Sequence, residues 1–118
     1  MHIIFGRDHA TKLEENYTVL ELDTIRLMPS GQEITAFCVV ESIPINDMSK
    51  LESMRNLHCN LLIEYRKQNW NYCIQALEYL KGFWNRELDT FYDHLQSRID
   101  EYVKNPPDDS WDGKIEKS

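Results

Sequence analysis

His58, Cys59 and Cys73 are the residues whose types could support nucleophilic chemistry. An imidazole beside a thiol can take its proton and leave a nucleophilic thiolate. These three residues, however, lie on or beside an apolar stripe with helical spacing, where histidine and cysteine are more often buried structural side chains. We therefore expect no catalytic residue among them. A small enzyme that uses His58 and Cys59 remains an alternative to the two functions considered below.

Asp108, Asp109 and Asp112 form the other chemically suggestive group, because clustered carboxylates can bind a divalent cation. Such sites need several oxygens fixed by a defined turn, whereas these residues fall in a polar C-terminal segment. The histidines lack partners at ligand spacing, and the three cysteines contain no C-x-x-C pair. With only four glycines, the chain also lacks the phosphate-binding glycine motifs. We expect neither a metal ion nor a cofactor to be held by this chain alone.

The net charge of the chain limits the kinds of partner that it is expected to bind. The formal net charge is −7, and no lysine- or arginine-rich run is present to neutralise phosphates, so we expect no nucleic-acid binding. The chain has no apolar run near the roughly 18 residues of a membrane span. Its first residues meet Arg7 and Asp8 before an export signal could form. An odd number of cysteines suits a reducing compartment, so we expect a cytoplasmic location.

The first third of the chain has the pattern of strands. A strand at residues 3–5, stopped by Gly6, precedes a short helix that opens at Asp8 or Thr11. A longer strand follows, and its apolar positions change phase near Asp23 and Thr24, which predicts a β-bulge. A turn at residues 29–32 then leads to a strand at 33–41 that is apolar on both faces.

The rest of the chain has helical periodicity. We predict amphipathic helices over residues 49–67, 70–80 and 88–103, the first opened by a capping box of Ser49 and Glu52. The first two helices have the size of one tetratricopeptide-like pair. Gly82 ends the second helix, and the Asn-Pro-Pro run at 105–107 ends the third. We expect an α+β chain with a strand, helix and bulged hairpin in residues 1–42, a helical extension in 43–107 and a polar tail in 108–118.

The sequence resembles a known family over almost its whole length, and two parts of it carry the resemblance most clearly. The hairpin pattern Tyr17-x-x-Leu20-Glu21-Leu22-Asp23-x-Ile25-Arg26-Leu27, followed by Glu33 and Phe37-Cys38-Val39-Val40, is similar to the closing hairpin of class III adenylate/guanylate cyclase catalytic domains. The ending Asn105-Pro106-Pro107-Asp108-Asp109-Ser110-Trp111-Asp112-Gly113 resembles the "PP-x-x-WDG" terminus of the helical extension behind bacterial domains of this class.

The resemblance implies which parts of a cyclase are missing. Such enzymes convert ATP or GTP to a cyclic nucleotide and pyrophosphate, using Mg or Mn held by two aspartates that lie upstream of the matched region. The family's hairpin lysine, which contacts the triphosphate, is replaced here by Met28, which cannot pair with phosphate. Arg26, two residues earlier on the same strand face, is the candidate for that triphosphate contact, with a solvated strand arginine as the alternative.

The resemblance therefore implies a non-catalytic structural or regulatory part of a class III cyclase, inactive alone. Its expected partner is a cyclase catalytic domain, or a second copy through the hairpin edges. The alternative is an autonomous helical interaction module whose groove is lined by Tyr65, Trp70 and Tyr72.

Overall fold

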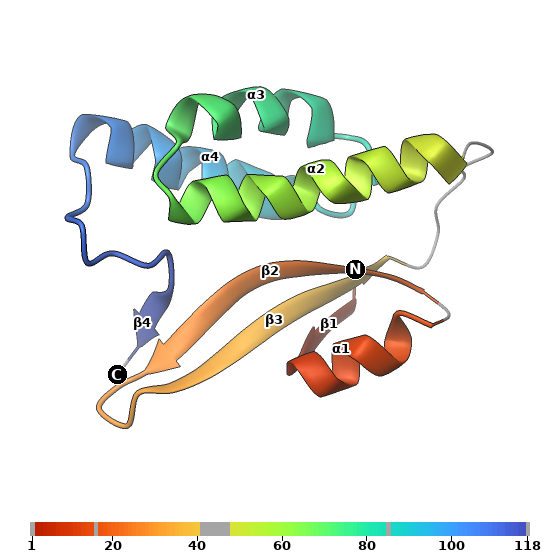
Figure 1. Cartoon of the computed structure of the whole chain (residues 1–118), viewed down its shortest axis with the longest axis horizontal. Helices are drawn as coiled ribbons and strands as arrows, with labels where there is room; N and C mark the ends of the chain where they lie inside the picture. The colour runs from red at the N-terminus through yellow and green to blue at the C-terminus, as the bar shows by residue number, and fades with distance from the viewer. Residues whose placement is uncertain (1, 16, 41–47, 85, 118) are drawn as a thin grey trace. The chain divides into compact units, whose positions relative to one another are not determined.

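The structure is a computed structural model of the chain, and it describes residues 2–15, 17–40, 48–84 and 86–117 (Figure 1). The expected α+β class is confirmed, with one four-stranded sheet and four helices among the described residues. The chain divides into two compact units. The sheet unit contains residues 1–41 and 113–118, and the helical unit contains residues 42–112. Residues 108–112 of the expected polar tail belong to the helical unit, and residues 113–118 belong to the sheet unit.

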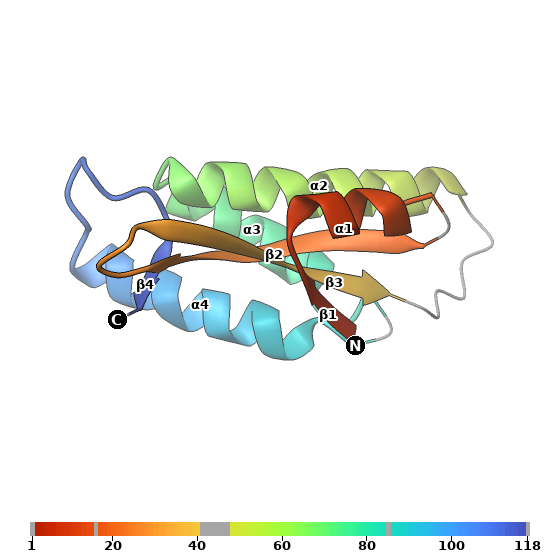
Figure 2. The ribbon, with the colours of Figure 1, turned by 90° about the horizontal axis from the view of Figure 1, so that it is seen from below.

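The sheet unit is built on an antiparallel hairpin. Its strands follow the order β1-β3-β2-β4, and their bounds are β1 (His2–Phe5), β2 (Thr18–Leu27), β3 (Gln32–Val40) and β4 (Ile115–Lys117). Figure 2 shows β1 alongside β3 and β4 beside the end of β2. The last five residues of β3 are buried, as its apolar sequence predicted, because it is one of the two inner strands.

The predicted bulge is present in β2. Glu21 pairs with Phe37, but the next pair joins Thr24 to Thr35, so that two residues of β2 oppose one residue of β3. A side-chain hydrogen bond of 3.0 Å between the Thr24 and Thr35 hydroxyls follows the bulge. Because an extra residue exchanges the faces of a strand, the bulge accounts for the change of apolar phase in the sequence.

The short helix α1 (Arg7–Leu13) supplies the core on one face of the sheet. It begins at Arg7 rather than at Asp8 or Thr11, directly after Gly6, whose φ of 94° is a conformation that L residues rarely adopt. The buried side chains under this helix come from all three antiparallel strands and from the helix itself: Ala10, Val19, Phe37 and Val39, with Ile4 and Leu13 partly buried.

β4 is the one strand that the sequence did not predict. It pairs in parallel with β2, with Ile25 opposite Ile115 and Arg26 opposite Glu116. A segment of only three residues is too short to show the alternation of polar and apolar residues that identifies a strand. The strand conformation of β4 therefore depends on its pairing with β2. The outer side of β3 pairs with β1.

The helical unit contains α2 (Met48–Arg66), α3 (Trp70–Leu80) and α4 (Asp89–Lys104), which confirms the three predicted helices. Ser49 lies inside α2 instead of preceding it, so it is not the N-cap of a capping box. Gly82 follows α3 with a φ of 82°, and its N–H donates to the Asp89 carboxylate at 2.7 Å. None of the described helices is both long and apolar enough to cross a membrane.

Candidate functional site

The candidate triphosphate contact, Arg26, lies on β2 between two carboxylates. Its Nη2 atom is 3.1 Å from Oε2 of Glu33, and its Nη1 atom is 3.0 Å from Oε1 of Glu116. A guanidinium group binds carboxylate and phosphate oxygens with the same donors. A triphosphate would therefore have to compete with both acidic side chains for Arg26.

Glu33 is the centre of this ionic group. Lys114 donates to both of its carboxylate oxygens, at 3.0 and 2.9 Å, in addition to the contact with Arg26. These hydrogen bonds, from Lys114 first and Arg26 second, lower the pKa of Glu33 below its usual range. The group thus joins β2, β3 and the residues around β4 by charge.

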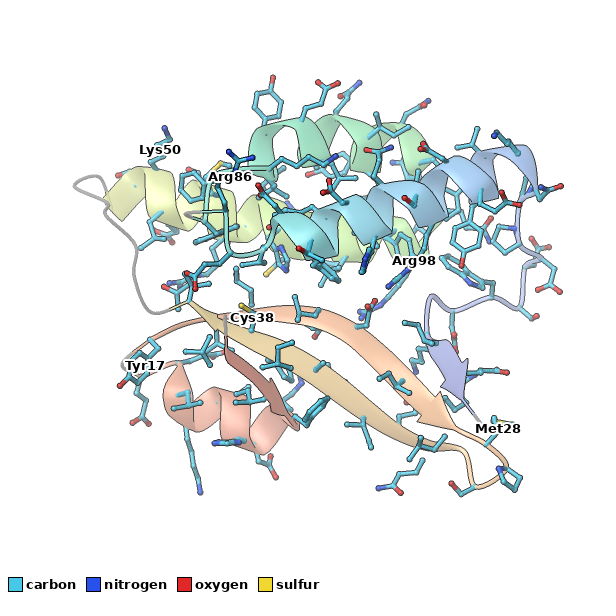
Figure 3. The ribbon with its side chains drawn as sticks, turned by 180° about the vertical axis from the view of Figure 1, so that it is seen from behind. Tyr17, Met28, Cys38, Lys50, Arg86 and Arg98 are labelled. Atoms are coloured by element: carbon cyan, nitrogen blue, oxygen red, sulfur yellow. The ribbon has the colours of Figure 1, made fainter. Side chains whose placement is uncertain are left out.

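Met28 lies at the turn between β2 and β3, where the resemblance would place a lysine (Figure 3). Its side chain is among the exposed large hydrophobic ones. A thioether has no N–H donor for a phosphate oxygen. At the position where the resemblance would place a triphosphate-binding lysine, the turn therefore has an exposed apolar side chain.

The structure separates His58 from Cys59. His58 is fully buried, and its Nδ1 atom lies 2.9 Å from the hydroxyl oxygen of Tyr92 on α4. That oxygen also accepts the indole N–H of Trp84 at 3.0 Å, so its own proton can be donated to Nδ1. Cys59 is exposed, on another side of the helix. The imidazole is thus engaged in a buried polar chain, which favours the structural role expected for it.

Cys73 has a similar structural environment. Its side chain is fully buried, and the thiol donates to the Leu61 carbonyl at a distance of 3.7 Å. Burial raises the pKa of this thiol to about 12. A thiol with such a pKa stays protonated at neutral pH, and a protonated thiol is a poor nucleophile.

The acidic residues near the C-terminus form a local turn. Asp108 Oδ1 accepts hydrogen bonds from the backbone N–H and the hydroxyl of Ser110, at 3.1 and 2.6 Å. Its backbone carbonyl accepts the N–H of Trp111. Among the described residues, no three His, Cys, Asp or Glu side chains are grouped to hold a metal ion. The carboxylate of Asp108 is used to shape the turn before Trp111.

Four aromatic rings gather at one end of the helical unit. Trp111 lies 5.2 Å from the Tyr65 ring, 5.7 Å from the Trp70 ring and 5.1 Å from the Tyr102 ring, between centroids. Such edge-to-face and offset contacts add stability beyond the buried area. The three partners come from α2, α3 and α4. Trp111, in the C-terminal segment, therefore packs against one end of each of the three helices.

This aromatic cluster, made of Tyr65, Trp70, Tyr102 and Trp111, bears on the groove expected for an interaction module. Tyr65 is buried, and Trp70 also stacks on Tyr102 at 5.4 Å. Burial raises the pKa of Tyr65, and a hydrogen bond with Arg98 of α4 opposes that rise. Tyr72 lies outside the cluster. Two of the three rings expected to line a groove, Tyr65 and Trp70, are thus packed against each other.

Sequence reasoning missed two parts of these sites. Trp84 lies in the segment between α3 and α4, outside the predicted helices, and it is fully buried. The large apolar surface of the tryptophan side chain was the feature of the sequence that could have predicted its burial. The contacts of Arg26 with Glu116 and of Glu33 with Lys114 were missed because the paired residues are far apart in the sequence. Only the pairing of β4 brings them together.

Comparisons with known proteins give no relative for this chain. No protein-family model matches it, and no curated protein and no solved structure matches it.

Proposed function

We propose that this chain is a non-catalytic structural or regulatory part of a class III nucleotide cyclase. In this proposal, its parent reaction converts ATP or GTP to a cyclic nucleotide and pyrophosphate, with Mg or Mn bound by residues outside this chain. The chain itself carries no cofactor, and we propose a cytoplasmic location. Its role is to complete the cyclase sheet and to position the catalytic part through its helices.

The observation that carries this proposal is the structural use of the Pro-Pro…Trp-Asp-Gly ending, the most specific part of the resemblance. Trp111 packs into the aromatic cluster of the helical unit, and the residues directly after Gly113 form β4 on the sheet unit. Trp111 of the motif thus contributes to the packing of the helical unit, and Gly113 lies two residues before β4. This structural role supports the proposal that the Pro-Pro…Trp-Asp-Gly ending is retained as part of the scaffold of the fold.

Two further observations support a non-catalytic role. Met28 stands where the family's lysine would contact the triphosphate, and Arg26 is engaged by Glu33 and Glu116. His58 and Cys73, the groups that could have supplied different chemistry, are buried in structural hydrogen bonds. The packing of Tyr65 and Trp70 within the aromatic cluster gives the interaction-module alternative less support.

The test uses the full chain with and without the polypeptide encoded immediately upstream. Alone, with Mg²⁺ or Mn²⁺ and ATP or GTP, the chain is expected to form no cyclic nucleotide. Added to the upstream polypeptide, it should raise cyclic-nucleotide formation, and Trp111→Ala should weaken that effect. Turnover by the chain alone would contradict the proposal. An upstream polypeptide without the two metal-binding aspartates, or one indifferent to the chain, would also contradict it.

A further inference from the structure

β1 is an edge strand with two exposed large apolar side chains. It stands at one end of the sheet order and pairs on its inner side with β3. Ile3 and Phe5 are 50% and 57% exposed, whereas Ile4, between them, packs toward α1. Alternation along the strand places Ile3 and Phe5 together on the face opposite α1. The strand thus presents a small apolar surface next to an edge with which no other described strand pairs.

The outward backbone groups of β1 are those of the same two residues. The Gly6 N–H donates to the Thr35 carbonyl at 3.0 Å, and the register places Ile4 opposite Phe37. In an antiparallel pair the residues that bond to the partner alternate, so Gly6 and Ile4 face β3. The N–H and C=O groups of Ile3 and Phe5 therefore point away from the sheet.

The opposite end of the sheet has the features that discourage edge pairing. β4 has three residues, and its sequence Ile-Glu-Lys contains two charged ones. Short, charged edges are the usual protection against pairing with another chain. Residues 2–6, His-Ile-Ile-Phe-Gly, contain no Asp, Glu, Lys or Arg. β1 lacks the charged protection that β4 has.

We propose that β1 pairs antiparallel with β1 of a second copy of this chain, across a two-fold axis at Ile4. In this register Ile3 of each copy lies opposite Phe5 of the other, and both residues use their outward N–H and C=O groups. A β-branched residue opposite an aromatic one is a favourable cross-strand pair. The two sheets become one continuous sheet.

A second copy is favoured over another partner by the symmetry of the strand. Two-fold pairing needs a surface that complements itself, and the run Ile3-Ile4-Phe5 is apolar on both sides of its centre. Self-pairing here also brings no like charges together at the strand. The remaining charge of −7 on each copy opposes association, and salt screens this repulsion. The dimer should therefore strengthen as the salt concentration rises.

The test is sedimentation equilibrium of the full chain, from about 10 μM to about 1 mM, because a short strand pair is expected to bind weakly. We expect a monomer–dimer equilibrium that shifts toward dimer in added NaCl. Phe5→Lys and Ile3→Lys should each raise the dissociation constant by roughly tenfold or more, since charge on an edge strand opposes pairing. Tyr79→Lys, which changes a 71% exposed residue of α3, is the matched control and should leave the dimer intact.

Hydrogen exchange gives an independent reading of the same register. The Ile3 and Phe5 amides should exchange more slowly as the chain concentration rises, while the Ile4 amide stays protected throughout. Circular dichroism of both lysine variants should match the parent chain, because both side chains are exposed. A monomer at every concentration, or a dimer unaffected by Phe5→Lys and Ile3→Lys, would overturn the proposal. Neither result depends on the proposed relation to cyclases, since no nucleotide or catalytic part is used.

Discussion

The imidazole Nδ1 atom of His58, on α2, lies 2.9 Å from the hydroxyl oxygen of Tyr92, on α4. Both side chains are fully buried, so this contact joins two helices inside the helical unit. Trp84 donates to the same oxygen from the segment between α3 and α4. Buried polar groups of this kind stabilise a fold only while each keeps its partners.

Removal of the Tyr92 hydroxyl should destabilise the chain. Tyr92→Phe leaves the indole N–H of Trp84 without its acceptor and takes a partner from His58, which should cost about 1–3 kcal/mol of unfolding free energy. Urea unfolding followed by circular dichroism measures this cost. Tyr79→Phe removes the same atom from a 71% exposed residue and should change stability by less than about 0.5 kcal/mol. Equal losses in the two variants would contradict the role of the buried hydroxyl.

The three cysteines should react at different rates. Cys59 is exposed, whereas Cys38 and Cys73 are buried, and the pKa of Cys73 is raised to about 12 by burial. Alkylation of the native chain should therefore label Cys59 first, and the other two should react only on unfolding. Mass spectrometry of labelled peptides over time measures the order. Rapid native labelling of Cys73 would show that its thiol is not held as the structure places it.

Trp111 should stabilise the helical unit although it lies in a polar segment. Trp111→Ala removes ring contacts with Tyr65, Trp70 and Tyr102 and should cost about 1–3 kcal/mol. Trp111→Phe should recover part of that loss, because a smaller ring keeps some contacts. Near-ultraviolet circular dichroism and urea unfolding measure the two effects. A Trp111→Ala variant as stable as the parent would show that the tail does not fasten the helices.

Glu33 should titrate below the usual range of a glutamate. Its pKa is lowered in the folded chain by Lys114 and then Arg26, so its ionic contacts stabilise the fold above the unfolded pKa. This stabilisation should be lost as the pH falls through the folded pKa. An NMR titration of the Glu33 carboxyl group should show a midpoint that rises in Lys114→Met. No change in that midpoint would contradict the contact.

High salt provides a second measure of the same ionic group. Because Glu33 is at the surface, added NaCl should screen its contacts and raise the titration midpoint of the parent chain. The Lys114→Met variant should respond less, since one of the two cations is already absent. Comparing the salt response of the titration midpoint in the parent chain and in Lys114→Met distinguishes the effect of charge from an effect of altered β4 packing.

The amino-acid sequence alone determined the elements whose stabilising contacts are repeated along the chain. Periods of two and about 3.6 predicted β2, β3 and the three long helices, and the phase change at Asp23 and Thr24 predicted the bulge. Glycine and proline positions predicted where α3 and α4 end. These features depend on local patterns, which a single sequence carries in full.

Only the tertiary structure decided the roles of residues that act over long separations. β4 is a strand because Ile115 meets Ile25, and Arg26 is paired because β4 brings Glu116 beside it. Trp84 can be buried with its N–H satisfied because the Tyr92 hydroxyl accepts that N–H. Three residues in a tail or one tryptophan in a connection have no period of their own. Their conformation and burial are set by partners that come from other parts of the chain.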